Sequence, residues 1–246
     1  MPGPGSSQEL ARNLASVRRR LEAAAHRAHR AADDIRLVAV SKTFPAARVR
    51  EAAAAGQTAF GENKVQDALG KIDALADLDL DWHLIGHLQS NKARKAAASF
   101  SWIETVDRLD LLRKLDAAAV EFRRRPRILV QVDLALEPTK HGAREEDVAA
   151  LVAAALEAKA LDVRGLMTIP PYPDTPEDSR PWFRRLRALR DRLVAAGLPA
   201  DRLRDLSMGM SQDFEIAIEE GATIVRVGTA IFGKRTVPSR EIAEPP

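Results

Sequence analysis

The sequence predicts an α/β protein that folds as a single (β/α)8 barrel, a TIM barrel, with one extra helix at its N-terminus. Its length of 246 residues is close to the roughly 250 that one such barrel needs. Short apolar segments rich in β-branched residues alternate with longer amphipathic segments, and eight such pairs follow one another. The composition is 46% hydrophobic and includes 43 alanines, which supplies one core and favours helix as the majority structure.

Changes in the apolar period justify the expected elements in chain order. Leucine and valine recur at spacings of three and four near the start, which predicts a first helix over 8–32. The period then shortens, and eight apolar segments such as RLVAVS and RILVQV are predicted as buried strands. These strands are expected over 36–41, 58–61, 82–85, 100–104, 127–132, 163–168, 204–206 and 222–227.

A helix is expected after each of these strands. Pro45 begins the first of them and Gly56 ends it, which is the usual placement of these two residue types. The predicted helices cover 45–56, 65–76, 91–98, 109–124, 144–159, 181–196 and 212–220, with a short one after 228. A doubly wound open sheet is the alternative fold, but no GxGxxG motif opens the first helix, so a dinucleotide site has no support.

The same pattern divides the chain into a flexible N-terminus (1–7), one barrel domain (8–235) and a C-terminal tail (236–246). Residues 1–7 are rich in Gly, Pro and Ser and lack the apolar segment of a signal peptide. The proline-rich segment 170–181 follows the sixth predicted strand, so we expect it to be a long loop of the catalytic face and not a domain boundary.

Composition argues against several classes of protein. The charge of +3 comes from 38 basic and 35 acidic residues, so three arginine clusters (18–20, 123–125 and 184–187) are expected to be solvated helix faces and no nucleic-acid partner is expected. No apolar run is long enough for a membrane span. The lack of cysteine excludes thiolate chemistry and suits a reducing compartment, so we expect a cytoplasmic protein.

The first predicted strand ends with Ser41, Lys42 and Thr43. If Val38, Val40 and Lys42 share one face, that face is the barrel interior, and a lysine there lies at the catalytic end of the strand. Partial desolvation is expected to lower the pKa of Lys42 and free its amine as a nucleophile toward an aldehyde. The alternative is a lysine whose amine reaches the solvent at the rim.

Two glycine-containing loops follow the seventh and eighth predicted strands, where barrels build phosphate sites. The first is SMGMS (207–211), and the second begins with Gly228 and Thr229. Backbone N–H groups beside glycines and helix N-termini attract anions, so these loops are expected to bind a phosphate. Because barrel closure places strand eight beside strand one, Lys42 is expected next to that phosphate. This pairing points to pyridoxal 5′-phosphate (PLP) held as a Schiff base, although an aldolase with a sugar phosphate offers the same pairing.

Arg226 lies inside the last apolar strand and needs a partner there. Aimed into the barrel mouth, its guanidinium can donate to the pyridine nitrogen of PLP and keep that nitrogen unprotonated, which discourages carbanion chemistry. The alternative is an ion pair with a core carboxylate such as Glu104 or Asp133.

Six stretches of the chain resemble the pyridoxal phosphate homeostasis protein family (PLP-binding proteins), in the right order and over about residues 10 to 235. They are AVSKT (39–43), FGENKVQ (60–66), WHLIGHLQSNK (82–92), GLMTIP (165–170), SMGMSQD (207–213) and VRVGTAIFG (225–233). The resemblance implies a lone barrel similar to the N-terminal domain of alanine racemase, acting as a PLP carrier and regulator in vitamin B6 homeostasis without robust catalysis. One departure is Asp133, where the family usually has Asn.

The resemblance also implies roles for single residues. Lys42 matches the cofactor lysine, Asn63 lines the cofactor site, and Arg226 faces the pyridine nitrogen. The phosphate is expected to be wrapped by Ser207, Gly209, Met210, Gly228 and Thr229. Met167 is expected to pack in the pocket, because thioethers adapt to a ring-shaped ligand.

The main alternative function is a PLP-dependent amino-acid racemase of low activity. Racemisation needs acid/base groups on both faces of the substrate, and the single tyrosine of this chain, Tyr172, lies in the proline-rich loop.

No catalytic residue and no metal ligand are expected. His83 and His87 flank Gly86, so they are not predicted as a metal pair, and His83 is expected at the barrel mouth. Glu62 is expected to be a rim charge. The expected partners are PLP and PLP-dependent apoenzymes, and a monomer is expected.

Overall fold

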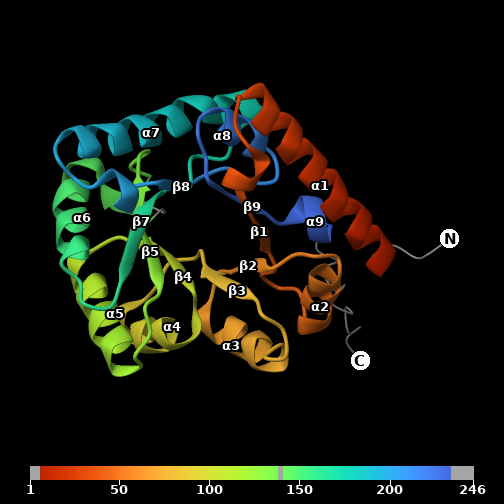
Figure 1. Cartoon of the computed structure of the whole chain (residues 1–246), viewed down its shortest axis with the longest axis horizontal. Coiled ribbons are helices and arrows are strands. Elements are labelled where there is room, and N and C mark those ends of the chain that lie inside the picture. Colours follow the sequence, from red (N-terminus) through yellow and green to blue (C-terminus); the bar gives the residue numbers. More distant parts are fainter. Residues whose placement is uncertain (1–5, 138–140, 234–246) are drawn as a thin grey trace, which may run out of the picture.

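The computed structural model describes residues 6–137 and 141–233, and it confirms the predicted barrel. Eight parallel strands close in the order β1–β2–β3–β4–β5–β7–β8–β9, with β9 hydrogen-bonded to β1 (Figure 1). Val38 of β1 lies opposite Arg226 of β9 in the register. The strands of the barrel are Arg36–Val40 (β1), Ala59–Glu62 (β2), Asp81–Leu84 (β3), Trp102–Val106 (β4), Arg127–Asp133 (β5), Asp162–Met167 (β7), Asp205–Ser207 (β8) and Ile224–Val227 (β9).

Helices surround the barrel, and α1 runs along its outside against α2, α8 and α9 (Figure 1). The helices are Ser7–Arg27 (α1), Ala46–Ala54 (α2), Val65–Ala74 (α3), Ala93–Ser99 (α4), Leu109–Glu121 (α5), Val148–Leu156 (α6), Arg180–Ala195 (α7), Phe214–Glu219 (α8) and Thr229–Phe232 (α9). Every predicted strand and helix is present within a few residues of its expected bounds. Residues 1–5 of the expected N-terminus and the whole expected tail, 236–246, lie outside the described residues.

The first helix ends five residues before its predicted end. His29 takes a left-handed backbone conformation (φ 52°), and the N–H of Arg30 donates to the carbonyl of Ala25 at 2.9 Å. This bond closes the last turn in the way a C-terminal glycine usually allows. A histidine at this position gives no such signal in the sequence, so the apolar period alone overestimates the helix.

The predicted helix over 144–159 was wrong at its start. A two-residue strand, β6 (Ala143–Arg144), pairs with the end of β5, and α6 begins only at Val148. Gly142 precedes β6 with φ 146°, and a Cβ there would lie 2.5 Å from the backbone nitrogen of Asp133. This close approach of two backbones requires glycine and brings the segment back to β5.

The barrel interior is divided into an apolar floor and a polar layer. A cluster of buried side chains from different strands fills the floor: Val38, Ala59, Trp102, Leu129, Met167 and Ile224. Above it, buried polar groups on β3, β4, β8 and β9 occupy the middle of the barrel. The open end above this layer, at the C-terminal ends of the strands, is therefore left for a binding site.

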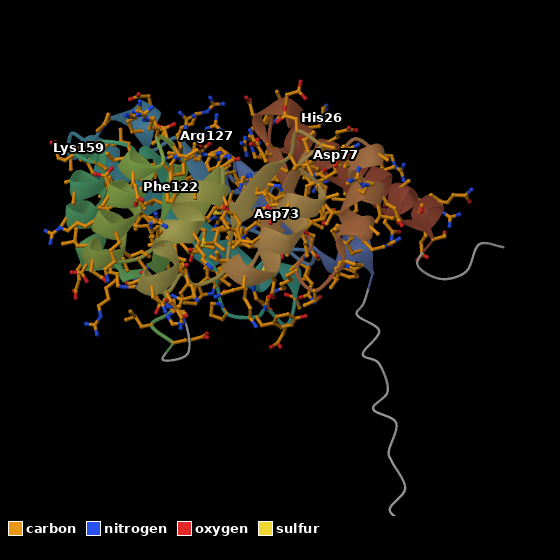
Figure 2. All side chains as sticks on the ribbon, turned by 90° about the horizontal axis from the view of Figure 1, so that it is seen from below. His26, Asp73, Asp77, Phe122, Arg127 and Lys159 are labelled. Atoms are coloured by element: carbon orange, nitrogen blue, oxygen red, sulfur yellow. The ribbon has the colours of Figure 1, made fainter. Side chains whose placement is uncertain are left out.

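The outer surface is charged, and many of its arginines are paired with carboxylates. Figure 2 shows side chains such as Asp73, Asp77 and Lys159 pointing away from the ribbon. Arg20 meets Glu215 at 2.7 Å, and Arg184 meets Glu220 at 3.1 Å. These pairs agree with solvated helix faces, whereas the absence of a nucleic-acid partner stays a prediction. Within the described residues, no helix combines the length and apolarity needed to cross a membrane.

Candidate functional site

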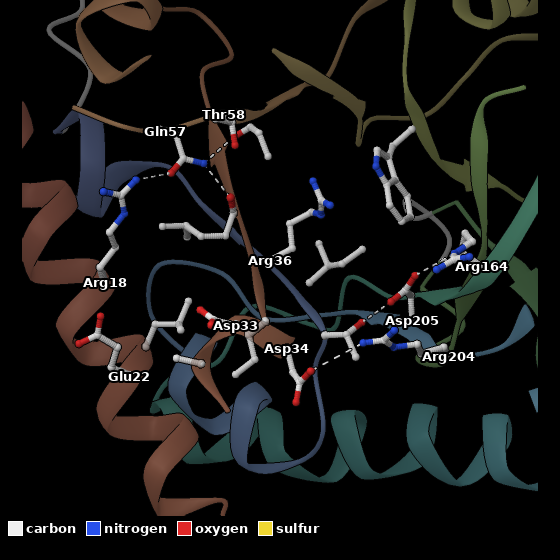
Figure 3. Close-up of a pocket in the computed structure, with 18 of the residues that line it drawn as sticks. Arg18, Glu22, Asp33, Asp34, Arg36, Gln57, Thr58, Arg164, Arg204 and Asp205 are labelled. Carbon is white, nitrogen blue, oxygen red and sulfur yellow. Dashed lines mark hydrogen bonds and ion pairs between the residues drawn. The ribbon is translucent and has the colours of Figure 1, made fainter. Parts of the chain in front are cut away.

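Two large cavities open at opposite ends of the barrel. The one at the N-terminal ends of the strands has a volume of about 640 Å³ and is rich in arginine (Figure 3). Three of its arginines are paired with carboxylates: Arg36 is 2.8 Å from Asp81, Arg164 is 3.5 Å from Asp205, and Arg204 is 3.7 Å from Asp34. None of the site residues predicted from the sequence lines this cavity.

The second cavity, about 400 Å³, lies at the C-terminal ends of the strands. Six of the nine predicted cofactor residues line it: Lys42, Asn63, Met210, Arg226, Gly228 and Thr229. The other lining residues are Val40, Ile85, Ile169, Tyr172, Pro173, Ser211, Gln212 and Asp213. We call this space the Lys42 cavity, and it is the candidate functional site because barrels carry their sites at this end.

A strained turn presents Lys42 at the cavity. Thr43, directly after it, has φ 71°, which is rare for a β-branched residue and marks a conformation that the surroundings enforce. The N–H of Phe44 closes the turn by donating to the carbonyl of Ser41 at 3.0 Å. The expected desolvation of Lys42 was wrong: the residue is exposed at the rim, because it lies beyond the end of β1.

A buried ion pair holds this turn from below. The Ser41 hydroxyl donates to Glu62 at 2.6 Å, and the Lys71 ammonium donates to the same Glu62 oxygen at 2.6 Å and to the Ser41 carbonyl at 2.8 Å. Glu62 is only 1% exposed, so its predicted place as a rim charge was wrong. Lys64, two residues later in the sequence, is not the partner of Glu62 here. The partner is Lys71 of α3, which is nine residues later and packs against the ends of β1 and β2.

Arg226 crosses from β9 into the barrel and contacts its neighbours through two hydrogen bonds. One guanidinium nitrogen, Nη1, donates to the hydroxyl of Ser207 at 2.6 Å, and the other, Nη2, donates to the carbonyl of Thr168 at 2.9 Å. The residue is 4% exposed, yet it lines the Lys42 cavity. Arg226 thus lines the cavity, and the predicted alternative of an ion pair with a core carboxylate takes another form, in which Ser207 lies between the guanidinium and that carboxylate.

That carboxylate is Glu104 of β4. The Ser207 hydroxyl donates to Glu104 Oε2 at 2.5 Å, and Glu104 Oε1 lies 2.6 Å from Nδ1 of His83. His83 is fully buried and stacks on Trp102 with ring centroids 5.1 Å apart, so its predicted place at the barrel mouth was wrong. We call the chain Arg226–Ser207–Glu104–His83 the interior network.

Burial and charge act against each other in the interior network. Burial by itself raises the pKa of Glu104, but the hydrogen bonds from His83 and Ser207 and the charge of Arg226 outweigh it and hold the pKa below its ordinary value. Burial lowers the pKa of Arg226, and the carboxylates of Glu104 and Asp213 oppose that shift. The network therefore keeps a balanced charge pair beneath the cavity.

Three predicted site residues do not line the cavity. Met167 is buried in the apolar floor, and Ser207 gives its hydroxyl to the interior network. Gly209 has φ 92°, and a Cβ on it would lie 2.5 Å from that of Ala217. Its carbonyl accepts the N–H of Arg226 at 3.0 Å, so it joins the loop after β8 to β9.

Ser211 is the last residue of the predicted phosphate loop 207–211, and its hydroxyl is one of the donors expected there. Its oxygen accepts the N–H of Gly228 at 3.1 Å and that of Ala230 at 3.5 Å, and the residue lines the cavity. The N–H of Gly228 is therefore already bonded to Ser211, and this bond ties the loop after β8 to the start of α9.

Gly86 is a residue whose role the sequence did not predict. A Cβ at this position would lie 2.3 Å from the carbonyl oxygen of Asn63, so only glycine lets the loop after β3 pack against the Asn63 backbone. A glycine directly after a predicted strand was the available signal. Asp133, the departure from the family pattern, does not line the cavity; its carboxylate accepts the N–H groups of Ala135 and Leu136 at 3.2 and 2.9 Å.

Comparisons with known proteins agree with this geometry. The family model for the N-terminal domain of alanine racemase matches residues 8–236. The chain is 45% identical over 222 residues to the pyridoxal phosphate homeostasis protein of Aquifex aeolicus, covering 90% of this chain and 96% of that protein. It is 46% identical over 226 residues to the protein of the same name from Pseudomonas aeruginosa, covering 92% and 96%.

Solved structures show the same likeness. PipY from Synechococcus elongatus PCC7942, solved with PLP bound, has a TM-score of 0.80 at 42% identity and covers 91% of this chain and 100% of that chain. Alanine racemase from Corynebacterium glutamicum shares the fold, with a TM-score of 0.69 at 18% identity over 96% of this chain and 64% of that chain.

Proposed function

The chain belongs to the pyridoxal phosphate homeostasis protein family, and we propose that it binds PLP in the Lys42 cavity and serves PLP homeostasis without robust catalysis. The observation that carries this proposal is the joint position of Lys42 and Arg226, which line one cavity at the ends of two paired strands, β1 and β9. The relatives are named for PLP homeostasis and not for a reaction.

The residues of the cavity fit this cofactor. PLP supplies an aldehyde that condenses with a primary amine, and Lys42 places such an amine on the rim. Arg226 offers a guanidinium to the ring, while Ser211, Gly228 and Thr229 form the part of the wall from which a phosphate can be held. Ile85 and Ile169 supply apolar walls for the ring.

Arg226 also explains why binding need not lead to turnover. Its buried positive charge, fixed by Ser207 and Thr168, opposes a second positive charge on a pyridine nitrogen beside it. A ring without that proton withdraws electrons poorly. The arrangement thus favours holding the cofactor over carbanion chemistry.

Borohydride reduction followed by mass spectrometry tests the attachment. The purified chain saturated with PLP is expected to absorb near 420 nm, to lose that band on reduction, and to carry the reduced adduct on the peptide of Lys42. The variant Lys42→Ala should lose both signals, whereas Lys95→Ala, which removes an exposed lysine of α4, should keep them. An unmodified Lys42 peptide in PLP-saturated protein would overturn the proposal.

A racemase of low activity is the second candidate, because Tyr172 lines the same cavity as Lys42. Tyr172 is 76% exposed and its hydroxyl accepts a hydrogen bond from Gln212, so no buried contact holds the phenol near the reacting atoms. We expect no racemisation of L-alanine at ordinary rates of about 1 per second or faster. Chiral chromatography of the reaction mixture measures this, and turnover that Tyr172→Phe abolishes would favour the racemase.

We also propose that the protein is a cytoplasmic monomer that passes PLP to apoenzymes. The cysteine-free composition supports the location, and the exposed rim position of Lys42 supports a transfer of cofactor. Light scattering during size-exclusion chromatography measures the mass, and cell fractionation measures the location. Reactivation of a PLP-dependent apoenzyme by the loaded chain, compared with free PLP at the same concentration, tests the transfer.

A further inference from the structure

A second group of ligand-type side chains lies at the same end of the barrel but outside the Lys42 cavity. His87 follows β3, Asp107 directly follows β4, and His141 lies two residues before β6. One ligand atom of each lies within 4.8 Å of those of the other two. The imidazole rings of His87 and His141 stack with centroids 3.6 Å apart, and Nδ1 of His87 is 3.7 Å from Oδ2 of Asp107.

We propose that His87, Asp107 and His141 bind one divalent transition-metal ion of the Zn²⁺ type. Two imidazoles and one carboxylate are the ligand set of many three-residue zinc sites, where water completes the coordination. Ligand atoms around a tetrahedral ion with bonds of 2.0–2.1 Å are about 3.3 Å apart. The ligand atoms therefore need to approach by about 1.5 Å or less, and the stacked imidazoles need to turn so that the nitrogen lone pairs, which lie in the ring planes, converge on the ion.

The carboxylate of the proposed site is already oriented. Asp107 accepts a hydrogen bond from Nη1 of Arg108 at 2.6 Å on one oxygen, Oδ1, while the other oxygen, Oδ2, faces His87. Arg108 is itself held by Ser90, whose hydroxyl accepts from Nη2 at 3.0 Å. Outer contacts of this kind fix the direction of a metal-binding carboxylate.

The backbone that carries His141 is anchored as well. Its carbonyl accepts the side-chain N–H of Gln131 at 2.6 Å, and the next residue, Gly142, packs directly against the backbone of Asp133. The three ligands thus come from segments held at the ends of β3, β4 and β5. A bound ion would link these three neighbouring strand ends.

The sequence did not predict a metal pair at His83 and His87, which agrees with the structure. His83 is buried with Glu104 inside the barrel and cannot share a ligand site with His87. The actual neighbour of His87 is His141, which is 54 positions later in the sequence. The pairing of β3 with β4 and of β4 with β5 brings the two imidazoles together.

Titration calorimetry with ZnCl₂ on the untagged, PLP-loaded full chain tests the site. We expect one ion per chain, and a Kd raised by about 100-fold or more in His87→Ala and in His141→Ala. His26→Ala is the matched control because Figure 2 shows His26 on the outside of the molecule, and it should bind as the unchanged chain does. Both ligand histidines are exposed, so the variants are expected to fold, and circular dichroism checks this.

Three results would overturn the site: no stoichiometric binding to the unchanged chain, equal weakening by His26→Ala, or unaltered binding in both ligand variants. The last result would leave the rings as a stacked pair without an ion. A further variant, Lys42→Ala, separates this proposal from the proposed function. It is expected to keep Zn²⁺ binding even where it loses PLP, and loss of the ion in this variant would place the metal on the cofactor instead.

Discussion

At the scale of single residues, the interior network explains how a charged side chain is tolerated in the last strand. Arg226 is buried within an apolar segment, and a buried charge is costly unless it is paired. Ser207 of β8 links the Arg226 guanidinium to the carboxylate of Glu104 on β4 through two hydrogen bonds. The bridge keeps the guanidinium available at the cavity while its charge is balanced below.

The variant Glu104→Gln tests this balance. Removing one charge of a buried pair leaves the other uncompensated, so the free energy of unfolding at pH 7 should fall by about 3–5 kcal/mol. Urea unfolding measures it. Glu121→Gln, on the exposed face of α5, is the control and should change little because water screens its pair with Arg94.

The pH dependence of stability gives a second test of Glu104. Its pKa in the folded state lies below the unfolded value of about 4.3, so the carboxylate stabilises the fold above that pH. This contribution is lost as the pH falls through the folded-state pKa. Urea midpoints measured in steps from pH 5 downward should therefore fall less steeply in Glu104→Gln than in the unchanged chain. Parallel curves would contradict the assigned pKa shift.

At the scale of elements, the turns after the strands hold the site, and each depends on a local backbone feature. The turn that presents Lys42 contains Thr43 in a left-handed conformation, and the loop after β3 depends on Gly86. Neither feature follows from hydrophobic periodicity, because that periodicity describes which face of an element is buried and not how the chain leaves it. The strand ends were thus predictable, whereas the turns were not.

The variant Gly86→Ala tests the contact between two of these turns. Its methyl group would meet the Asn63 backbone, which cannot move like a side chain, so we expect a loss of about 1–3 kcal/mol in stability and weaker PLP binding. Gly70→Ala, in the open on α3, is the matched control and should stabilise the fold by about 0.5–1 kcal/mol. Equal PLP affinity in all three proteins would show that the position of Asn63 does not matter.

At the scale of the whole molecule, closure of β9 onto β1 brings the two ends of the chain into one site. Lys42 and Asn63 come from the first third of the sequence, and Arg226, Gly228 and Thr229 from its last tenth. A ligand that contacts both groups binds only the closed barrel. Its binding is therefore linked to the stability of the entire fold.

PLP is expected to stabilise the whole chain against heat. At a PLP concentration 100 times the Kd, mass action adds about 2.7 kcal/mol to the free energy of unfolding. Differential scanning calorimetry with and without PLP should show a higher Tm for the unchanged chain and a much smaller rise for Lys42→Ala. Equal Tm values with and without saturating PLP would contradict binding to the folded barrel.

Local sequence determined the alternation of eight strands and helices, the place of Lys42 near the C-terminal end of the first strand, and the position of Arg226 inside the last one. These features follow from the spacing of apolar residues and from residue type, and both can be read from residues that are close together in the sequence. Only the tertiary structure decided that Glu104 and His83 stand beneath Arg226, that Lys71 pairs with Glu62, and that His87 meets His141. Such partners are brought together by strand order and register, and these arise from packing across the whole barrel, which no local pattern records.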